Sequence, residues 1–252
     1  DLGVGNAADV VTVAAGATVA ATVTGNWTAS SSTRNQGSEA ADFTIAAAST
    51  HILDLTSATA GAAEGYSITS TGTGAITGSS GNDIIVDSSG VQDIKGLAGD
   101  DAITLTAGVD STVVLSATTT GGIDTITAFT TTDHTIDILA SGVAGSAGAN
   151  LGSGNYGEDA IGNLTAGTAY DVMVLTGASY ATVALAEDAV AGRMTSATKG
   201  YVIFADSDDS TAKMYYDADL ATDDNLISTA TVLTFAGVAN HGAIGAFFAI
   251  GD

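Results

Sequence analysis

The chain of 252 residues has no cysteine and no proline, and only five of its residues are basic. Without cysteine there are no disulfide bonds and no thiolate metal sites. An average chain of this length would contain about a dozen prolines at ~5% usage, so the turns here depend on other residues. Long apolar runs are missing too, since Ala7–Thr24 and Ala236–Gly251 are both interrupted by polar residues or glycine. Neither is an uninterrupted apolar span of about twenty residues, so we expect no membrane insertion.

The charge is strongly one-sided. Twenty-eight aspartates and glutamates against five lysines and arginines give a net charge of −23. Such a surface repels nucleic acid and anionic lipid, which excludes both as partners, and it attracts divalent cations. Yet 45% of the residues are apolar and the mean hydropathy is +0.33, so the chain is not a disordered polyanion. Its many small and β-branched residues favour tightly stacked strands.

Residues 69–113 repeat with a period of nine. Two units, Gly78–Val86 and Gly96–Thr104, fit the pattern G-x-x-G-[ND]-D-x-U-x, in which U is a large aliphatic residue. The two units begin eighteen residues apart, and partial units at 69–77, 87–95 and 105–113 keep the second glycine of the pattern in phase. This spacing predicts a parallel β-roll, in which each nonapeptide forms a tight turn and then a short strand.

In such a roll eighteen residues make one coil, so equivalent positions stack about 4.7–4.9 Å apart. The aliphatic position points inward, and we expect an isoleucine ladder of Ile76, Ile85, Ile94 and Ile103. The pattern also places Asp83 and Asp101 on one flank of adjacent coils. Two carboxylates this close repel by ~4 kcal/mol at an effective dielectric constant near 20, and a divalent cation between them reverses the sign.

Calcium suits this flank because it accepts six to eight oxygen ligands in flexible geometry. The candidate ligands are the side chains of Asn82, Asp83, Asp100 and Asp101, with the carbonyl oxygens of Gly81 and Gly99. The opposite flank offers Gln92 and Asp110, and Asp110 is the candidate ligand for a second ion there. The alternative is an ion-free β-solenoid whose turns are rich in glycine and aspartate.

The pattern along the chain predicts an all-β fold, a parallel β-roll or β-solenoid. Residues 1–41 are expected to form a strand-rich arm or cap, and 42–140 the solenoid, with the regular roll at 69–113. Residues 141–157, rich in glycine, alanine, serine and asparagine, are expected to be a flexible loop. Residues 158–252 are expected to form a β-rich module with one short helix at 180–194 and a hairpin of 201–204 with 213–216.

Three segments together resemble the RTX (repeats-in-toxin) group of bacterial proteins exported by type I secretion. They are the repeats at 78–104, the following segment Gly122–Phe129, and the end of the chain, with Tyr201–Asp206, Met214–Asp219 and Leu226–Val238. The resemblance implies a calcium-binding roll and an export signal within 158–252. The chain departs from the family pattern where Ser79 and Leu97 replace the second glycine of a doublet. The composition is most similar to RTX-type surface-layer proteins, in which the roll and its calcium organise a lattice.

We predict that the chain is not an enzyme. His51, His134 and His241 stand alone, so there is no HExxH zinc motif, and no GxSxG nucleophile elbow is present. The carboxylates are numerous, but no pair is singled out as a glycosidase acid and nucleophile.

The sequence therefore predicts an extracellular, calcium-dependent, self-assembling structural protein at the bacterial cell surface, a surface-layer or filament subunit whose partner is itself. Extracellular modules that bind calcium at about 10⁻⁴ to 10⁻³ M would stay unfolded inside the cell and fold after export. Two alternatives remain open. One is an RTX adhesin or matrix module that binds glycans such as cell-surface polysaccharide. The other is the carboxy-terminal RTX fragment of a larger secreted hydrolase.

Overall fold

The structure is a computed structural model. It describes residues 11–60, 64–90, 93–115, 122–130, 132–138, 156–160, 172–194, 200–206, 211–217, 220–221, 231–236 and 248–249. The chain divides into two compact units. The first comprises Asp1–Leu115 and Asp124–Thr135, and the second comprises Ser116–Ile123 and Ile136–Asp252. The chain therefore passes between the units at 115–116, 123–124 and 135–136, and not at the loop expected at 141–157.

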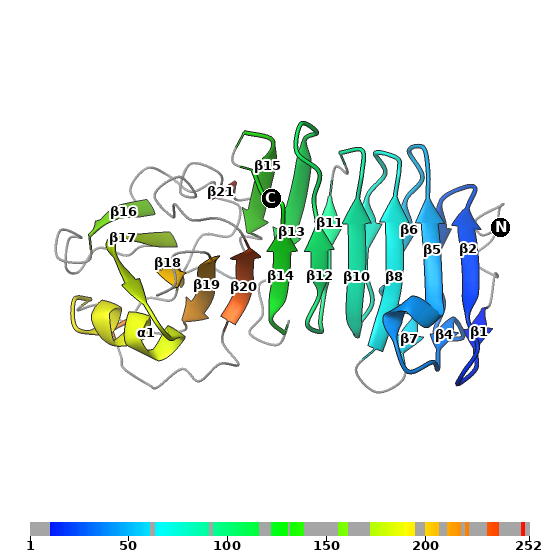
Figure 1. Cartoon of the computed structure of the whole chain (residues 1–252), viewed down its shortest axis with the longest axis horizontal. Coiled ribbons are helices and arrows are strands. Elements are labelled where there is room, and N and C mark those ends of the chain that lie inside the picture. The colour runs from blue at the N-terminus through cyan, green and yellow to red at the C-terminus, as the bar shows by residue number, and fades with distance from the viewer. Residues whose placement is uncertain are drawn as a thin grey trace. The chain divides into compact units, whose positions relative to one another are not determined.

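The first unit is a parallel β-solenoid (Figure 1). Its largest sheet, which we call the front sheet, contains one strand from each coil, in chain order. These strands are β2 (Val19–Val23), β5 (Phe43–Ala47), β8 (Glu64–Ser70), β10 (Asn82–Asp87), β12 (Ala102–Thr104) and β14 (Asp124–Thr127). Each strand pairs in parallel with the next, so the sheet grows by one strand per coil.

Two further sheets complete the coils. The back sheet consists of β3 (Trp27–Thr28), β6 (Leu53–Asp54), β9 (Ile76–Thr77), β11 (Ile94–Lys95) and β13 (Ser111–Leu115), followed by β15 (His134–Ile138). A small third sheet consists of β1 (Thr12–Val13), β4 (Arg34–Asn35) and β7 (Thr59–Ala60), and a 3₁₀ turn, η1 (Ala40–Asp42), links β4 to β5. The coils before residue 78 thus have three strands, whereas the nonapeptide coils have two.

The predicted isoleucine stacking is confirmed, as two ladders rather than one. Ile85 pairs with Ile103 in the front sheet, and Ile76 pairs with Ile94 in the back sheet. Each pair is eighteen residues apart, as the repeat predicts. The front ladder continues through Ile45, Ile68 and Ile126, and the back ladder through Trp27, Leu53 and Val113. All these side chains are buried, and burying one aliphatic side chain contributes roughly 1.5–3 kcal/mol.

The boundary expected at residue 41 does not separate an arm from the solenoid. Strand β2 pairs with β5 over Val19–Val23, and β3 pairs with β6, so residues 12–41 already follow the solenoid path. The nine-residue period is absent there because each of these coils carries a third strand and longer connections such as η1. Parallel pairing between strands continues the solenoid through this region, although the sequence shows no repeat there.

The second unit is built around a mixed sheet. Strands β16 (Tyr156–Ala160), β17 (Val172–Tyr180) and β18 (Gly200–Asp206) run parallel, and β19 (Thr211–Asp217) and β20 (Thr231–Ala236) continue the sheet in antiparallel pairing. The predicted hairpin is therefore confirmed as β18–β19. The part of β15 that belongs to this unit, from Ile136 on, pairs in parallel with β21 (Phe248–Ala249) through Ile136 and Phe248.

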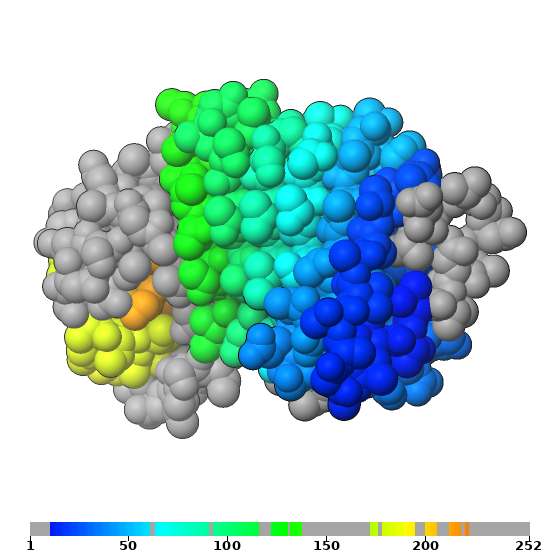
Figure 2. All heavy atoms as spheres, turned by 45° about the vertical axis from the view of Figure 1, so that its right-hand side comes forward, coloured from blue at the N-terminus to red at the C-terminus, as the bar shows by residue number. Residues whose placement is uncertain are grey.

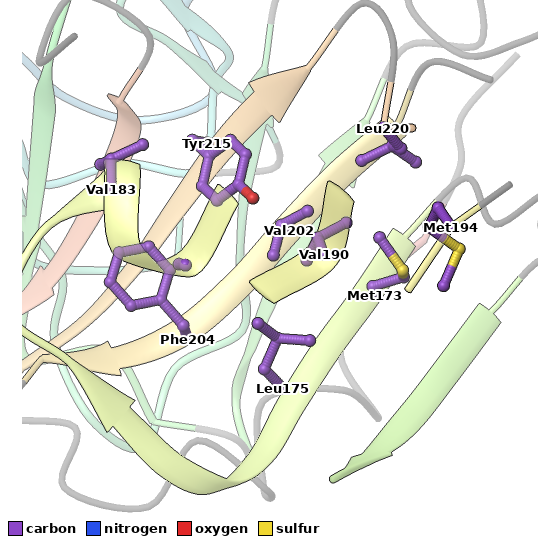
Figure 3. Packing of buried hydrophobic residues seen from close by; sticks show 10 residues of the cluster. Met173, Leu175, Val183, Val190, Met194, Val202, Phe204, Tyr215 and Leu220 are labelled. Atoms are coloured by element: carbon purple, nitrogen blue, oxygen red, sulfur yellow. The ribbon is translucent and has the colours of Figure 1, made fainter. Parts of the chain in front are cut away.

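The predicted helix is also confirmed, as α1 (Val183–Ala191). The Thr182 side chain caps it by accepting a hydrogen bond from the backbone N–H of Leu185 at 3.2 Å. Its apolar face packs on the sheet, as Figure 3 shows. The buried cluster comprises Met173, Leu175, Val183, Ala186, Val190, Met194, Val202, Phe204, Tyr215 and Leu220.

The predicted all-β class is confirmed, with parallel sheets and one short helix. Of the loop predicted at 141–157, residues 141–155 lie outside the described residues, and 156–157 begin β16. Within the segment expected to carry an export signal, residues 222–230, 237–247 and 250–252 also lie outside them. Among the described residues, no helix has the length and apolar content needed to cross a membrane.

Candidate metal site

One inward-facing column of the front sheet changes character along the solenoid. The position two residues before the front ladder holds Phe43 and Tyr66 in the second and third of the three-stranded coils, and their rings pack edge to face at 5.1 Å between centroids. In the next three coils the same position holds Asp83, Asp101 and Asp124, all buried. The interior of the regular roll therefore contains a stack of three carboxylates, which we call the aspartate column.

The column is held by hydrogen bonds that each reach back one coil. The backbone N–H of Tyr66 donates to Asp83 Oδ1 at 2.6 Å, and that of Asp83 donates to Asp101 Oδ1 at 2.8 Å. The backbone N–H of Asp101 in turn donates to Asp124 Oδ1 at 3.1 Å. Each carboxylate thus satisfies a buried N–H at the start of the preceding strand, which explains why acids are tolerated inside the coil.

Asp83 and Asp101 differ in their second carboxylate oxygen. Asp83 Oδ2 accepts the backbone N–H of Ser79 at 2.6 Å, and the Ser79 hydroxyl lies 3.1 and 3.2 Å from the two carboxylate oxygens. Eighteen residues later Leu97 occupies the place of Ser79, with a positive φ of 82°. Asp101 Oδ2 is buried and has no hydrogen-bond partner. One oxygen of the column is therefore left open, in the coil where leucine replaces serine.

Burial disfavours the charged form of all three acids. It raises the pKa of Asp83 and of Asp124 to about 7, although backbone N–H donors oppose the rise. Burial raises the pKa of Asp101 to about 9, and the neighbouring charge of Asp124 adds to the shift. The two basic residues of this unit, Arg34 and Lys95, lie on strands of the other two sheets. A proton or a bound cation must therefore compensate the column.

Glycine permits the close approach of the turns around the column. A Cβ on Gly96 would overlap Asp101 Oδ2, and a Cβ on Gly78 would lie 2.5 Å from Asp83 Oδ2 and 2.6 Å from the Gly96 carbonyl oxygen. A Cβ on Gly99, where φ is +111°, would lie 2.6 Å from the carbonyl oxygen of Gly81. Carbonyl oxygens of one turn therefore lie directly against the next, close to the carboxylates.

The outer ligand candidates also stack. The backbone N–H of Asp100 donates to Asn82 Oδ1 at 2.9 Å, which joins equivalent turns of adjacent coils. A pocket beside them is lined by Asn82, Asp83 and Asp100, and by two acids that the sequence reasoning did not identify, Glu39 and Glu64. Glu64 pairs with Asn82 across β8 and β10, whereas Glu39 comes from the turn before η1. Acidic side chains therefore lie on the outer surface of these coils as well as in their interior.

The residues present fit a hard cation such as calcium in their chemistry, because every candidate donor is an oxygen and one buried carboxylate oxygen is free. Within the described part of the chain, no group of three or more His, Cys, Asp or Glu side chains is arranged to hold a metal ion alone. A calcium ion here would therefore depend on carbonyl oxygens and on Asn82 as well as on carboxylates.

Six of the seven predicted ligands lie on this flank, namely Gly81, Asn82, Asp83, Gly99, Asp100 and Asp101. The seventh, Asp110, is exposed and lies at the opposite end of β12, where its carbonyl oxygen would be 2.8 Å from a Cβ on Gly90. It does not join the aspartate column. The structure instead adds Asp124, which the sequence reasoning missed because its coil breaks the eighteen-residue spacing. The signal D-x-I, shared by Asp83, Asp101 and Asp124, identifies it.

Of the three lone histidines, His134 is a packed core residue. Its Nδ1 accepts the backbone N–H of Thr130 at 2.8 Å, and its Nε2 lies 3.2 Å from the carbonyl oxygen of Thr106. The Nε2–H tautomer satisfies both contacts. His134 therefore has a structural role in the turn before β15.

Comparisons with known proteins bring no further assignment to this site. No protein-family model matches the chain, and neither a curated protein nor a solved structure is significantly similar to it. The interpretation therefore rests on the residues themselves.

Proposed function

We propose that the chain is an extracellular, calcium-dependent structural subunit that assembles with copies of itself, as a surface layer or filament at a bacterial cell surface. The observation that carries the proposal is the aspartate column. Three buried carboxylates stack in consecutive coils, and Asp101 Oδ2 has no partner among the described residues. A column of buried carboxylates needs a proton or a bound cation to compensate it at neutral pH, and bound calcium would supply that charge.

Asp101 is the acid best placed to bind calcium, because the second oxygen of Asp83 is already occupied by Ser79. Asp100, Asn82 and the carbonyl oxygens of Gly81 and Gly99 would complete the ligand set, with Asp83 and Asp124 in the coils on either side. Bound calcium would supply positive charge that offsets the repulsion within the column. The chain itself supplies the ordered turns, through Gly81 and Gly99 and through the N–H donors that orient each carboxylate.

Charge also couples the site to folding. The chain has a net charge of −23, and its unfolded form keeps these acids apart in water. Folding brings Asp83, Asp101 and Asp124 together, which is favourable only when their charge is compensated. The acidic chain would therefore remain unfolded where calcium is scarce and would fold where calcium is millimolar, outside the cell.

Thermal unfolding followed by circular dichroism tests the calcium part of the proposal. At free calcium a hundredfold above Kd, binding stabilises the folded state by about 2.7 kcal/mol, so the midpoint should fall clearly when EGTA is added. An equal concentration of magnesium is the control, because it dehydrates reluctantly and demands rigid octahedral geometry. A spectrum and midpoint unchanged by EGTA would contradict calcium-dependent folding.

Electron microscopy of the purified chain with calcium tests the assembly part. Ordered sheets or filaments that disappear with EGTA support the structural subunit. Monomers that bind polysaccharide would favour the adhesin alternative, and a catalytic region encoded upstream would favour the secreted hydrolase.

A further inference from the structure

The aspartate column contains two equivalent turns that carry different side chains beside the acid. Ser79 and Leu97 are eighteen residues apart, and each lies four residues before an acid of the column, Asp83 or Asp101. The strands that follow, β10 and β12, pair in parallel with a constant offset of eighteen residues, so the two turns occupy equivalent places in adjacent coils. Figure 2 shows the coils of the first unit side by side, from blue to green.

Ser79 fills the space around the carboxylate of Asp83. It is fully buried, its backbone N–H donates to Asp83 Oδ2 at 2.6 Å, and its hydroxyl lies 3.1 and 3.2 Å from the two carboxylate oxygens. The hydroxyl oxygen accepts the backbone N–H of Gly81 at 3.1 Å, so its own hydrogen is directed to the carboxylate. With the N–H of Tyr66 on Oδ1, both oxygens of Asp83 are hydrogen-bonded, which stabilises the charged form without a cation.

Leu97 leaves the equivalent carboxylate open. Leucine has no hydroxyl group, and no hydrogen-bond donor among the described residues reaches Asp101 Oδ2, although this atom is buried. The backbone also differs, because Leu97 has a φ of 82° whereas Ser79 has no positive φ. A buried carboxylate oxygen without a partner is costly, and a hard cation is a partner that would satisfy it.

The other oxygens beside the two acids are alike. A Cβ on Gly99 would lie 2.6 Å from the carbonyl oxygen of Gly81, and a Cβ on Gly81 would overlap the carbonyl oxygen of Glu64 in the same way. Further out, the N–H of Asp100 donates to Asn82 Oδ1, and Asn82 pairs with Glu64 across the strands. Both acids therefore have carbonyl and side-chain oxygens beside them, and the main difference between the two turns is the serine.

We propose that Ser79 takes the place of a calcium ion beside Asp83, so that the regular roll binds one ion, at Asp101. This inference rests on the proposed calcium site, and it identifies the residue that sets the number of ions. Calcium binds oxygen ligands at about 2.3–2.6 Å, and the Ser79 nitrogen already lies 2.6 Å from Asp83 Oδ2. An ion at Asp83 would have to displace both this N–H and the hydroxyl. Asp83 thus belongs to a latent calcium site that a neutral side chain keeps closed.

The number of bound calcium ions tests this inference. Equilibrium dialysis of the full chain in about 0.15 M salt, which screens weak binding to exposed acids, counts the ions that bind tightly. The wild-type protein should bind one ion and Ser79→Gly two, because glycine lacks the hydroxyl and readily adopts the positive φ of Leu97. Ser80→Gly, at the exposed neighbouring serine, is the matched control and should bind one.

The outcomes separate this inference from the proposed function. Two ions in the wild-type protein, or one ion in a Ser79→Gly variant that folds by circular dichroism, would overturn the role of Ser79 and leave the calcium site at Asp101 in place. A wild-type protein that binds no calcium would contradict the proposed site itself, and the inference with it.

A double variant locates the added ion. Asp83→Asn in the Ser79→Gly background should return the count to one, since asparagine keeps an oxygen for the N–H of Tyr66 but loses the charge. A count that stays at two would place the added ion elsewhere and overturn the inference.

The reciprocal variant does not depend on the folding of Ser79→Gly. Leu97→Ser gives Asp101 the hydroxyl that Asp83 has, and it should weaken calcium binding by at least about tenfold, measured by titration calorimetry. An unchanged affinity in the folded Leu97→Ser variant would show that a serine here does not compete with the ion, and would overturn the proposal.

Discussion

The backbone N–H of Asp83 donates a hydrogen bond to Asp101 Oδ1, 2.8 Å away, although the two residues are eighteen positions apart in the chain. This bond joins the two complete nonapeptide units and sets the stacking of their carboxylates. It also fixes which oxygen of Asp101 remains open, because Oδ1 is used by the neighbouring coil and Oδ2 is not.

Replacing Asp101 with asparagine should remove most of the calcium response. Asparagine keeps Oδ1 for the N–H of Asp83 but loses the charge that would bind the ion. We expect the stabilisation by calcium, about 2.7 kcal/mol at a hundredfold excess over Kd, to fall largely to zero in thermal melts. Asp110→Asn is the matched control, since Asp110 lies at the other end of β12, and it should keep the full response. The reverse ranking of the two variants would contradict the proposed site.

Metal-free protein should become more stable as the pH falls. Burial raises the pKa of Asp83 and Asp124 to about 7 and that of Asp101 to about 9, whereas an unfolded aspartate titrates near 3.9. The folded state therefore binds more protons between these values, and its stability is greatest below pH ~4 and is lost as the pH rises through 7 to 9. Chemical denaturation in EGTA at several pH values measures this slope.

Other acidic residues of the protein also make its stability depend on pH. A variant of the aspartate column separates its contribution to the slope from theirs. Asp101→Asn should flatten the slope between pH 7 and 9, because it removes the acid with the highest pKa in the column. An unchanged slope in this variant would show that the column is not its source.

Leu97 should be a strained position whose replacement by glycine stabilises the protein. Its φ of 82° is a left-handed conformation that disfavours a leucine side chain by roughly 1–2 kcal/mol. Part of that gain is offset because glycine is more flexible when unfolded, so we expect a net stabilisation of about 0.5–1 kcal/mol in denaturant titrations. Ala98→Gly, at a neighbouring residue without a positive φ, should destabilise instead. Destabilisation by Leu97→Gly would mean that the packing of leucine outweighs its backbone strain.

Asn35 should be essential to the three-stranded coils. It is fully buried, and its Nδ2 donates to the carbonyl oxygens of Gly65 at 2.7 Å and Glu39 at 3.1 Å. Asn35→Ala leaves these acceptors unpaired and should lower the free energy of unfolding by about 1–3 kcal/mol, with or without calcium. Asn26→Ala, which removes one exposed hydrogen bond to the N–H of Ile52, should cost less. Comparable losses in urea titrations would argue against a special role for Asn35.

The sequence predicted the parts of the fold that repeat. Ile76, Ile85, Ile94 and Ile103 follow a fixed spacing because two nonapeptides close one coil, and the structure stacks them as expected. Strand β2 was not recognised as part of the solenoid, since the register from Val19 to Phe43 includes a third strand and η1. Pairing between coils of unequal length leaves no period in the sequence.

The sequence predicted which residues belong to the site better than it predicted how they are arranged. Asp83 and Asp101 stack in adjacent coils, as the spacing predicts. Their side chains point into the coil, however, and continue an interior column that begins with Phe43 and Tyr66. The repeat pattern does not indicate this change from aromatic to acidic side chains. Asp124 belongs to the same column through pairing of Ile103 with Ile126, a register that a nine-residue template misses. Glu39 reaches the pocket from a turn that no repeat describes.

The eighteen-residue register of Ile85 with Ile103 has a consequence for how such a chain varies in length. Adding or deleting one complete coil, or rung, of the solenoid shifts every later residue by about 4.8 Å along the solenoid axis. Each side chain stays on its original side of the sheet. Half a rung would move every later strand to the other sheet. Duplication in whole rungs is thus the natural route by which this molecule grows longer.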